Sequence, residues 1–143
     1  MGLLSGILGK KQEEHPPLDP ASAAATRLSS QTDTLADLLK RANDRLEAIP
    51  TDHGLYVYVG KPPKEFGVVW YKDGEEHSFM SVMKEKGLSG DQVQDLSDAL
   101  RDVYTAHIDE PRYSYPVGDK KVVVTPSEAL AVDLEGVIGA LGF

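Results

Sequence analysis

Two β-prone runs joined by a proline-containing turn restrict the fold of this chain more than any other feature. Residues 55–59 and 66–71 are rich in valine, tyrosine and other residues that favour strands, and residues 60–65 separate them. This arrangement predicts a β-hairpin. A second, shorter pair of runs, residues 112–117 and 121–124, flanks a Gly-Asp-Lys turn and predicts another hairpin.

Helical periodicity precedes the first hairpin. Apolar residues recur every three or four positions over residues 22–49, and Pro50 ends the pattern, so one long amphipathic helix is predicted. Its apolar positions are Leu28, Leu35, Leu38, Leu39, Ala42, Leu46 and Ile49. Part of this set also keeps a seven-residue spacing, which permits pairing with a second helix. Because Gln31 and Arg45 interrupt that spacing, we expect the helix to pack on the chain's own sheet.

Capping signals predict two further helices. Ser89 is followed three residues later by Gln92, the pattern of a capping box, and apolar residues then trace one helical face as far as residue 108. Residues 125–128 supply a cap, a proline and an acidic residue for a last helix. Residues 76–86 fit a strand, a short helix, or a strand followed by a helix.

These segments predict an α+β fold. We expect one antiparallel four-stranded sheet made from the two hairpins, with three to four helices packed mainly on one face. A single domain is expected over residues 21–143 behind a flexible N-terminal tail, residues 1–20, whose prolines and charges suit neither helix nor strand. Residues 28–72 and 91–125 share an α-β-β order, which is consistent with a weak internal repeat or with coincidence.

Composition narrows the classes of function. The chain has no cysteine, which excludes disulfides, thiolate metal ligands and cysteine nucleophiles. Its net charge of −8, with scattered lysine and arginine residues, argues against nucleic-acid binding. No run approaches the roughly 20 apolar residues that span a bilayer. We therefore expect a cytoplasmic protein without cofactor or membrane span.

The N-terminal stretch carries the one feature that suits a membrane or partner surface. Four apolar residues there recur at helical spacing and precede two lysines; they are Leu3, Leu4, Ile7 and Leu8. One amphipathic turn in peripheral contact with a membrane or partner is the alternative to a mobile end.

Tyrosines form the most specific pattern among candidate binding residues. In both hairpins they alternate with other residues, so each pair lies on one face of the sheet. If helices cover the opposite, aliphatic face, the tyrosines form an open surface of the kind that is enriched at protein interfaces. The residues of this predicted surface are Tyr56, Tyr58, Tyr71, Tyr113 and Tyr115. Tyrosine is also an ordinary strand former, so a structural role is the alternative.

A row of aspartates is the second candidate surface. Asp91, Asp95, Asp98 and Asp102 follow helical spacing opposite the apolar face. A basic partner or cation would relieve the repulsion between these carboxylates, while a solvated helix face is the alternative.

These surfaces, and the lack of a nucleophile or phosphate-binding motif, favour a non-catalytic protein-interaction or adaptor module. The alternative is a small hydrolase or metal-dependent enzyme, whose site would need Asp52, His53, Glu76 and His77 to converge in space. Homodimerisation through the first helix or a strand edge is compatible with either function.

Overall fold

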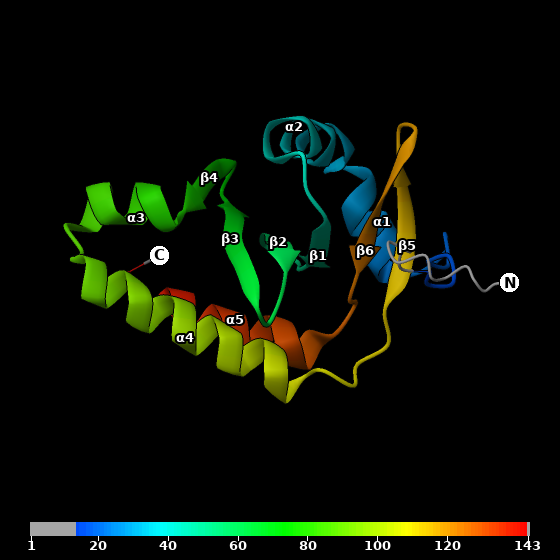
Figure 1. Cartoon of the computed structure of the whole chain (residues 1–143). Coiled ribbons are helices and arrows are strands. Elements are labelled where there is room, and N and C mark those ends of the chain that lie inside the picture. The colour runs from blue at the N-terminus through cyan, green and yellow to red at the C-terminus, as the bar shows by residue number, and fades with distance from the viewer. Residues whose placement is uncertain (1–13, 143) are drawn as a thin grey trace, which may run out of the picture.

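The computed structural model describes residues 14–142, and this part of the chain folds into an α+β structure around a mixed sheet (Figure 1). The elements in chain order are α1 (Ala23–Ser29), α2 (Thr32–Ala42), β1 (Leu46–Pro50), β2 (Gly54–Lys61), β3 (Glu65–Lys72), β4 (Glu75–Ser78), α3 (Phe79–Lys86), α4 (Gly90–Ala106), β5 (Tyr113–Val117), β6 (Lys120–Val124) and α5 (Glu128–Gly139). None of these helices is both long and apolar enough to cross a lipid bilayer.

The sheet has six strands in the order β4-β3-β2-β1-β6-β5. The neighbours pair in antiparallel fashion except β1 and β6, which run parallel. The two predicted hairpins are present as β2–β3 and β5–β6. The expected four-stranded antiparallel sheet is wrong in detail, because β1 lies between the hairpins and β4 adds a strand outside β3.

The predicted long helix over residues 22–49 is also wrong. It is divided into α1, α2 and β1, and α2 ends at Asn43, whose left-handed backbone (φ 51°) closes the helix. Residues 46–50 are all buried, because β1 is a central strand with helices over both faces. Apart from Glu47 this strand is a short apolar run, which periodicity alone does not distinguish from part of a helix.

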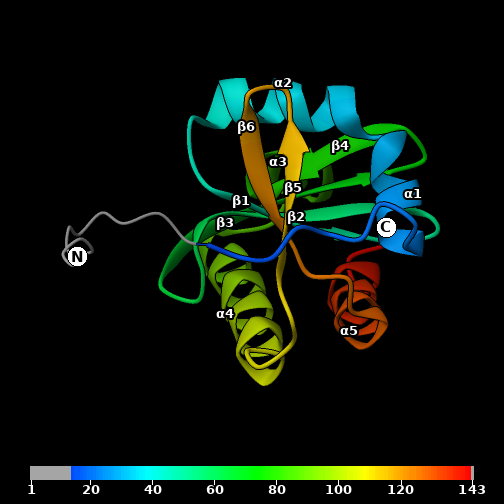
Figure 2. The same ribbon diagram turned by 90° about the vertical axis from the view of Figure 1, so that its right-hand side faces the viewer.

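Helices cover both faces of the sheet, which corrects the expectation of one covered face. Figure 2 shows α1 and α2 on one side and α4 and α5 on the other. Leu55 and Val57 of β2 pack under α1 and α2, whereas Tyr56 and Tyr58 pack under α4 and α5. The alternation predicted for this strand therefore exists, but each of its sides contributes to a hydrophobic core.

Of the three alternatives predicted for residues 76–86, the structure shows the third, a strand followed by a helix. β4 ends at Ser78, whose hydroxyl accepts a hydrogen bond from the Ser81 backbone and so caps α3. The two segments considered as a repeat differ locally. In residues 28–72 the helix α2 is followed by the strand β1, residues 46–50, whereas in residues 91–125 the helix α4 continues through Ala106.

The described chain begins beside β5, within the range predicted as a tail. The Leu18 amide donates to the Ser114 carbonyl at 2.9 Å, and the Ser114 amide donates to the Pro16 carbonyl at 2.9 Å. Leu18 is buried, so this stretch packs on the domain. The rest of the predicted tail, residues 1–13, lies outside the described residues, and so does the predicted amphipathic turn within it.

A buried carboxylate joins β1 to the surrounding elements. Glu47 is fully buried and accepts hydrogen bonds from Arg45 (2.9 Å), Tyr104 (2.8 Å), Thr125 (2.7 Å) and Arg112 (2.9 Å). Burial alone would raise the pKa of Glu47, but these hydrogen bonds and the two arginine charges hold it below its ordinary value. The carboxylate is therefore ionised, and its charge is matched inside the protein.

A histidine links α4 to α5 at the protein surface. One nitrogen of His107 lies 2.7 Å from the Asp133 carboxylate, and the other lies 3.1 Å from that of Glu110. Both contacts favour a protonated ring, because the hydrogen bonds that the ring donates to Asp133 and Glu110 raise the pKa of His107. The link is therefore strongest when the imidazole is charged.

We expect the stabilisation by His107 to fall with increasing pH. Because its pKa is higher in the folded than in the unfolded protein, its contribution is complete below the unfolded value, about 6.5. It disappears as pH rises through the folded value. Since Asp133 is 52% exposed, solvent limits the effect to about 0.5–1 kcal/mol. Urea unfolding of wild type and His107→Gln should differ more at pH 5.5 than at pH 9, whereas exposed His53→Gln serves as the control. Equal differences at both pH values would contradict this expectation.

Candidate functional site

The predicted tyrosine surface is not an open face of the sheet. Tyr58 is fully buried, and its hydroxyl donates to the Leu100 carbonyl of α4 at 2.8 Å. Its ring lies 5.0 Å from that of Tyr104. Tyr56 is buried beside it, and burial together with the charge of Glu135 raises the pKa of Tyr56 to about 12. These two tyrosines belong to the core.

The other three tyrosines lie on the opposite side of the sheet. Tyr71, Tyr113 and Tyr115 are half-buried against the core beneath α1 and α2. The expectation of one tyrosine-bearing surface is therefore wrong, because helices cover both faces and strand parity sends the two groups in opposite directions. A binding role based on this shared surface has lost its premise.

The four predicted aspartates do share an exposed face of α4. Asp98 receives hydrogen bonds from Gln94 at 3.0 Å and Arg101 at 2.9 Å. Asp91, Asp95 and Asp102 are exposed as well, as a solvated helix face requires. A basic partner for this row stays a prediction.

The residues of the predicted enzyme site do not gather. Asp52 pairs with Arg27, while Glu76 accepts two hydrogen bonds from Arg41 at 2.7 and 3.1 Å. His77 is buried with its ring stacked 5.8 Å from that of Trp70, and His53 is exposed in the β1–β2 turn. Within residues 14–142, no group of three histidine, aspartate or glutamate side chains is placed to hold a metal ion.

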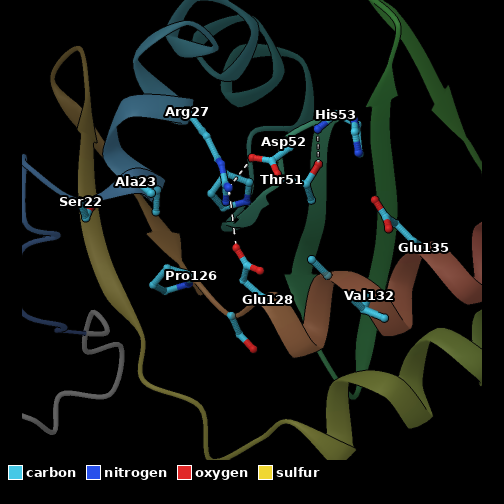
Figure 3. Close-up of a pocket in the computed structure, with 14 residues that line it drawn as sticks. Ser22, Ala23, Arg27, Thr51, Asp52, His53, Pro126, Glu128, Val132 and Glu135 are labelled. Carbon is cyan, nitrogen blue, oxygen red and sulfur yellow. Dashed lines mark hydrogen bonds and ion pairs between the residues drawn. The ribbon is translucent and has the colours of Figure 1, made fainter.

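One pocket lies where the parallel strands β1 and β6 end (Figure 3). Its volume is about 320 Å³, and α1, the β1–β2 turn and the start of α5 form its walls. Figure 3 shows Arg27 reaching between Asp52 and Glu128, with Glu128 3.7 Å away. Because two carboxylates already match the arginine, the pocket offers no spare positive charge. It is better explained as an ion-paired junction between the two helical layers.

A second site follows the outer edge of β3. β2 pairs with β3 along its whole length, from Glu65 to Lys72, whereas β4 pairs only with Val69 to Lys72. In Figure 1, β3 continues beyond the point where β4 gives way to α3. Among the described residues, no strand pairs with the outer side of residues 65–68. Backbone groups on this side are therefore available to another chain.

A groove of about 640 Å³ runs along this free edge. Five consecutive residues of β3, 65–69, line it together with residues from α2, β2 and the start of α3. Side chains of consecutive strand residues point to opposite faces, so a lining by all five means that the strand backbone itself borders the groove. Half of the other lining residues are apolar, including Leu38, Val59 and Phe79.

Gly67 and Met80 leave this groove open. A Cβ atom at Gly67 would meet no other atom within 4 Å, so the space above this strand position is empty. Met80, which lines the same groove, is 70% exposed and is the most exposed of the large apolar residues described. Methionine adapts to differently shaped partners, as is typical of binding surfaces.

The sequence contained one signal for this site that the residue patterns above did not use. Gly67 interrupts an otherwise apolar strand, and glycine within a strand often marks a place where another backbone comes close. Comparisons of this chain with protein-family models, curated proteins and solved structures gave no match, so the geometry alone describes the site.

Proposed function

We propose that this protein is a non-catalytic protein-interaction module, and that it captures an extended peptide segment by strand addition at the free edge of β3. The observation that carries this proposal is the coincidence of the unpaired edge, residues 65–68, with the apolar groove beside it. In strand addition, main-chain hydrogen bonds supply affinity and pockets for alternate side chains supply specificity. The free edge and the groove meet both requirements.

The lack of protection at this edge supports a binding role. Soluble proteins usually shield an edge strand with charges, prolines or bulges, because an exposed edge promotes aggregation. Here the unpaired edge carries one charge, Glu65 at its start, and the prolines stand in the preceding turn, while Phe66-Gly67-Val68 contains neither a charge nor a proline. An edge left open beside an apolar groove suits an extended ligand with an apolar side chain over Gly67.

Filling the groove at Gly67 should weaken peptide capture. The Gly67→Val side chain occupies the space above β3 and favours the strand conformation, so the fold is preserved. We expect short random peptides displayed on phage to yield ligands with alternating apolar residues. Their affinity for Gly67→Val should fall at least about tenfold, or ~1.4 kcal/mol, by fluorescence anisotropy.

Gly136→Val provides a matched control. This glycine lies exposed on α5, and a Cβ atom there also meets nothing within 4 Å. We expect the control to bind the selected peptides as wild type does. Equal binding by wild type and Gly67→Val, or selection of no peptide at all, would reject the groove as the binding site.

A further inference from the structure

We propose that the segment captured in this groove is Leu3–Leu8 of a second copy of the same chain, so that the protein forms a dimer by exchange of N-terminal segments. This inference rests on the proposed function, since it names the occupant of the same groove. It assigns a role to the apolar N-terminal stretch that precedes the described residues.

The composition of this stretch suits the groove. Residues 1–9 carry no charged side chain, and four of them are large and aliphatic. In an extended conformation Leu3 and Ile7 point to one side, while Leu4 and Leu8 point to the other. Either side of the added strand therefore presents apolar groups to a groove lined by Leu38, Val59 and other apolar residues.

Charge is also complementary around the groove. Arg41 lines it, but Asp37 and Glu76 already match this charge at 2.7 Å each. The remaining charged lining residues are Asp44, Lys61 and Glu65, which leave the groove with a net negative charge. Lys10 and Lys11 directly follow the apolar stretch and would meet this charge.

The distance along the sheet favours a second copy over the same molecule. Residues 16–18 lie beside β5 at one end of the sheet, and the free side of β3 lies towards the other end. Five strands separate the two positions: β5, β6, β1, β2 and β3. That is six strand spacings of ~4.8 Å, or about 29 Å. The eight residues from Leu8 to His15, counted back from Pro16, span at most about 29 Å when fully extended, which does no more than equal this straight distance. They would in addition have to pass around a helical layer.

Exchange between two copies removes this restriction and closes the assembly. Each molecule donates one segment and accepts one, so a single twofold arrangement fills both grooves. It also pairs the exposed β3 edges of both molecules, so capture of further copies through these two edges stops at two. The expected product is a dimer rather than a fibre.

Complementation between two defective variants tests the exchange in the full chain. Gly67→Val blocks the accepting groove, and Leu4→Asp/Ile7→Asp places a charge on both sides of the donated strand. We expect wild type to dimerise in sedimentation equilibrium and each variant to dimerise at least about tenfold more weakly. A mixture of the two variants should recover a heterodimer, because it contains one intact groove and one intact segment.

Matched controls carry the same chemical changes elsewhere. Gly136→Val adds the same side chain on α5, and Ala21→Asp/Ala23→Asp adds the same charge at exposed positions away from both the apolar stretch and the two lysines. Both should dimerise like wild type. Wild type that stays monomeric at high micromolar concentration, variants that dimerise normally, or a mixture that recovers no heterodimer would overturn the proposal.

The remaining outcomes separate this inference from the function on which it rests. If wild type is monomeric but phage-selected peptides still bind in a Gly67-dependent manner, the self-exchange fails and peptide capture stands. If Gly67→Val neither weakens dimerisation nor reduces peptide binding, both fail. Binding to anionic phospholipid vesicles that is lost in Leu4→Asp/Ile7→Asp, with dimerisation unchanged, would assign the segment to a membrane surface and overturn the exchange.

Discussion

Replacing Glu47 with alanine is expected to lower the free energy of unfolding by about 3–5 kcal/mol, the usual cost of removing one partner from a buried ion pair. The reason is that Arg112, whose side chain is only 11% exposed, would lose the carboxylate that matches its charge. The hydroxyls of Tyr104 and Thr125 would lose their acceptor as well. Urea unfolding at neutral pH measures this change.

Asp95→Ala removes an exposed carboxylate from α4 and serves as the control, with an expected change within about 0.5 kcal/mol. The pH dependence provides a second check. Because the pKa of Glu47 is lower in the folded than in the unfolded protein, its stabilisation is present above the unfolded value of about 4.3. It is lost as pH falls through the folded value. A Glu47→Ala cost below about 1 kcal/mol would show that the buried charges are not coupled as described.

Tyr58→Ala is expected to cost a similar amount, about 3–5 kcal/mol, because it leaves a cavity beneath α4. The Tyr58 ring is fully buried and contacts Phe66 and Tyr104, with ring centres 5.4 and 5.0 Å away. Tyr58→Phe keeps this packing and removes only the hydrogen bond to Leu100, so its cost should be about 1 kcal/mol. Both changes can be followed by urea unfolding with intrinsic fluorescence.

Tyr115→Ala on the opposite face provides the comparison. This half-buried ring should cost less when removed, about 1–2 kcal/mol, because less apolar surface is lost. Equal losses at Tyr58 and Tyr115 would contradict the separation of the tyrosines into a core pair and a peripheral group. A larger loss for Tyr58→Ala than for Tyr115→Ala would show that Tyr58 of β2 has a structural role and not a surface role.

Local signals in the sequence predicted the parts of the fold that form locally. Both hairpins and the helix that begins after Ser89 were predicted correctly, since turn residues and capping boxes act within a few positions of each other. Ser127 rather than Thr125 caps α5, a shift of two residues within the predicted signal. Boundaries of this kind depend on backbone geometry that residue type alone does not determine.

The errors arose where neighbours distant in sequence decide the structure. Residues 46–50 follow helical spacing, but pairing with β2 and β6 makes them a central strand. The alternation in β2 was recognised, but which of its faces is covered depends on where α4 and α5 pack, and these helices come only after β3, β4 and α3 in the chain. Period-two patterning assigns residues to faces without saying which face is exposed.

The candidate site was missed for a related reason. Gly67 is visible in the sequence as a glycine within a strand, but its meaning depends on the length of the neighbouring strand. Only because β4 stops at Ser78 does β3 retain an open edge beside Gly67. The converse holds for Asp52 and His77, where sequence offered reactive groups that the fold keeps with separate partners.

The parallel pairing of β1 with β6 has a consequence for how the chain is made. Residues 47 and 123 are partners in this pairing, so the inner strand β1 can complete its hydrogen bonds only after a segment 76 positions later in the chain has been made. During synthesis on the ribosome, one side of this apolar strand stays unpaired until the final hairpin has been translated. Exposed edges of this kind favour aggregation of incomplete chains. Products that end before Lys120 should accordingly be insoluble or rapidly degraded, although all residues of the β3 groove are present in them.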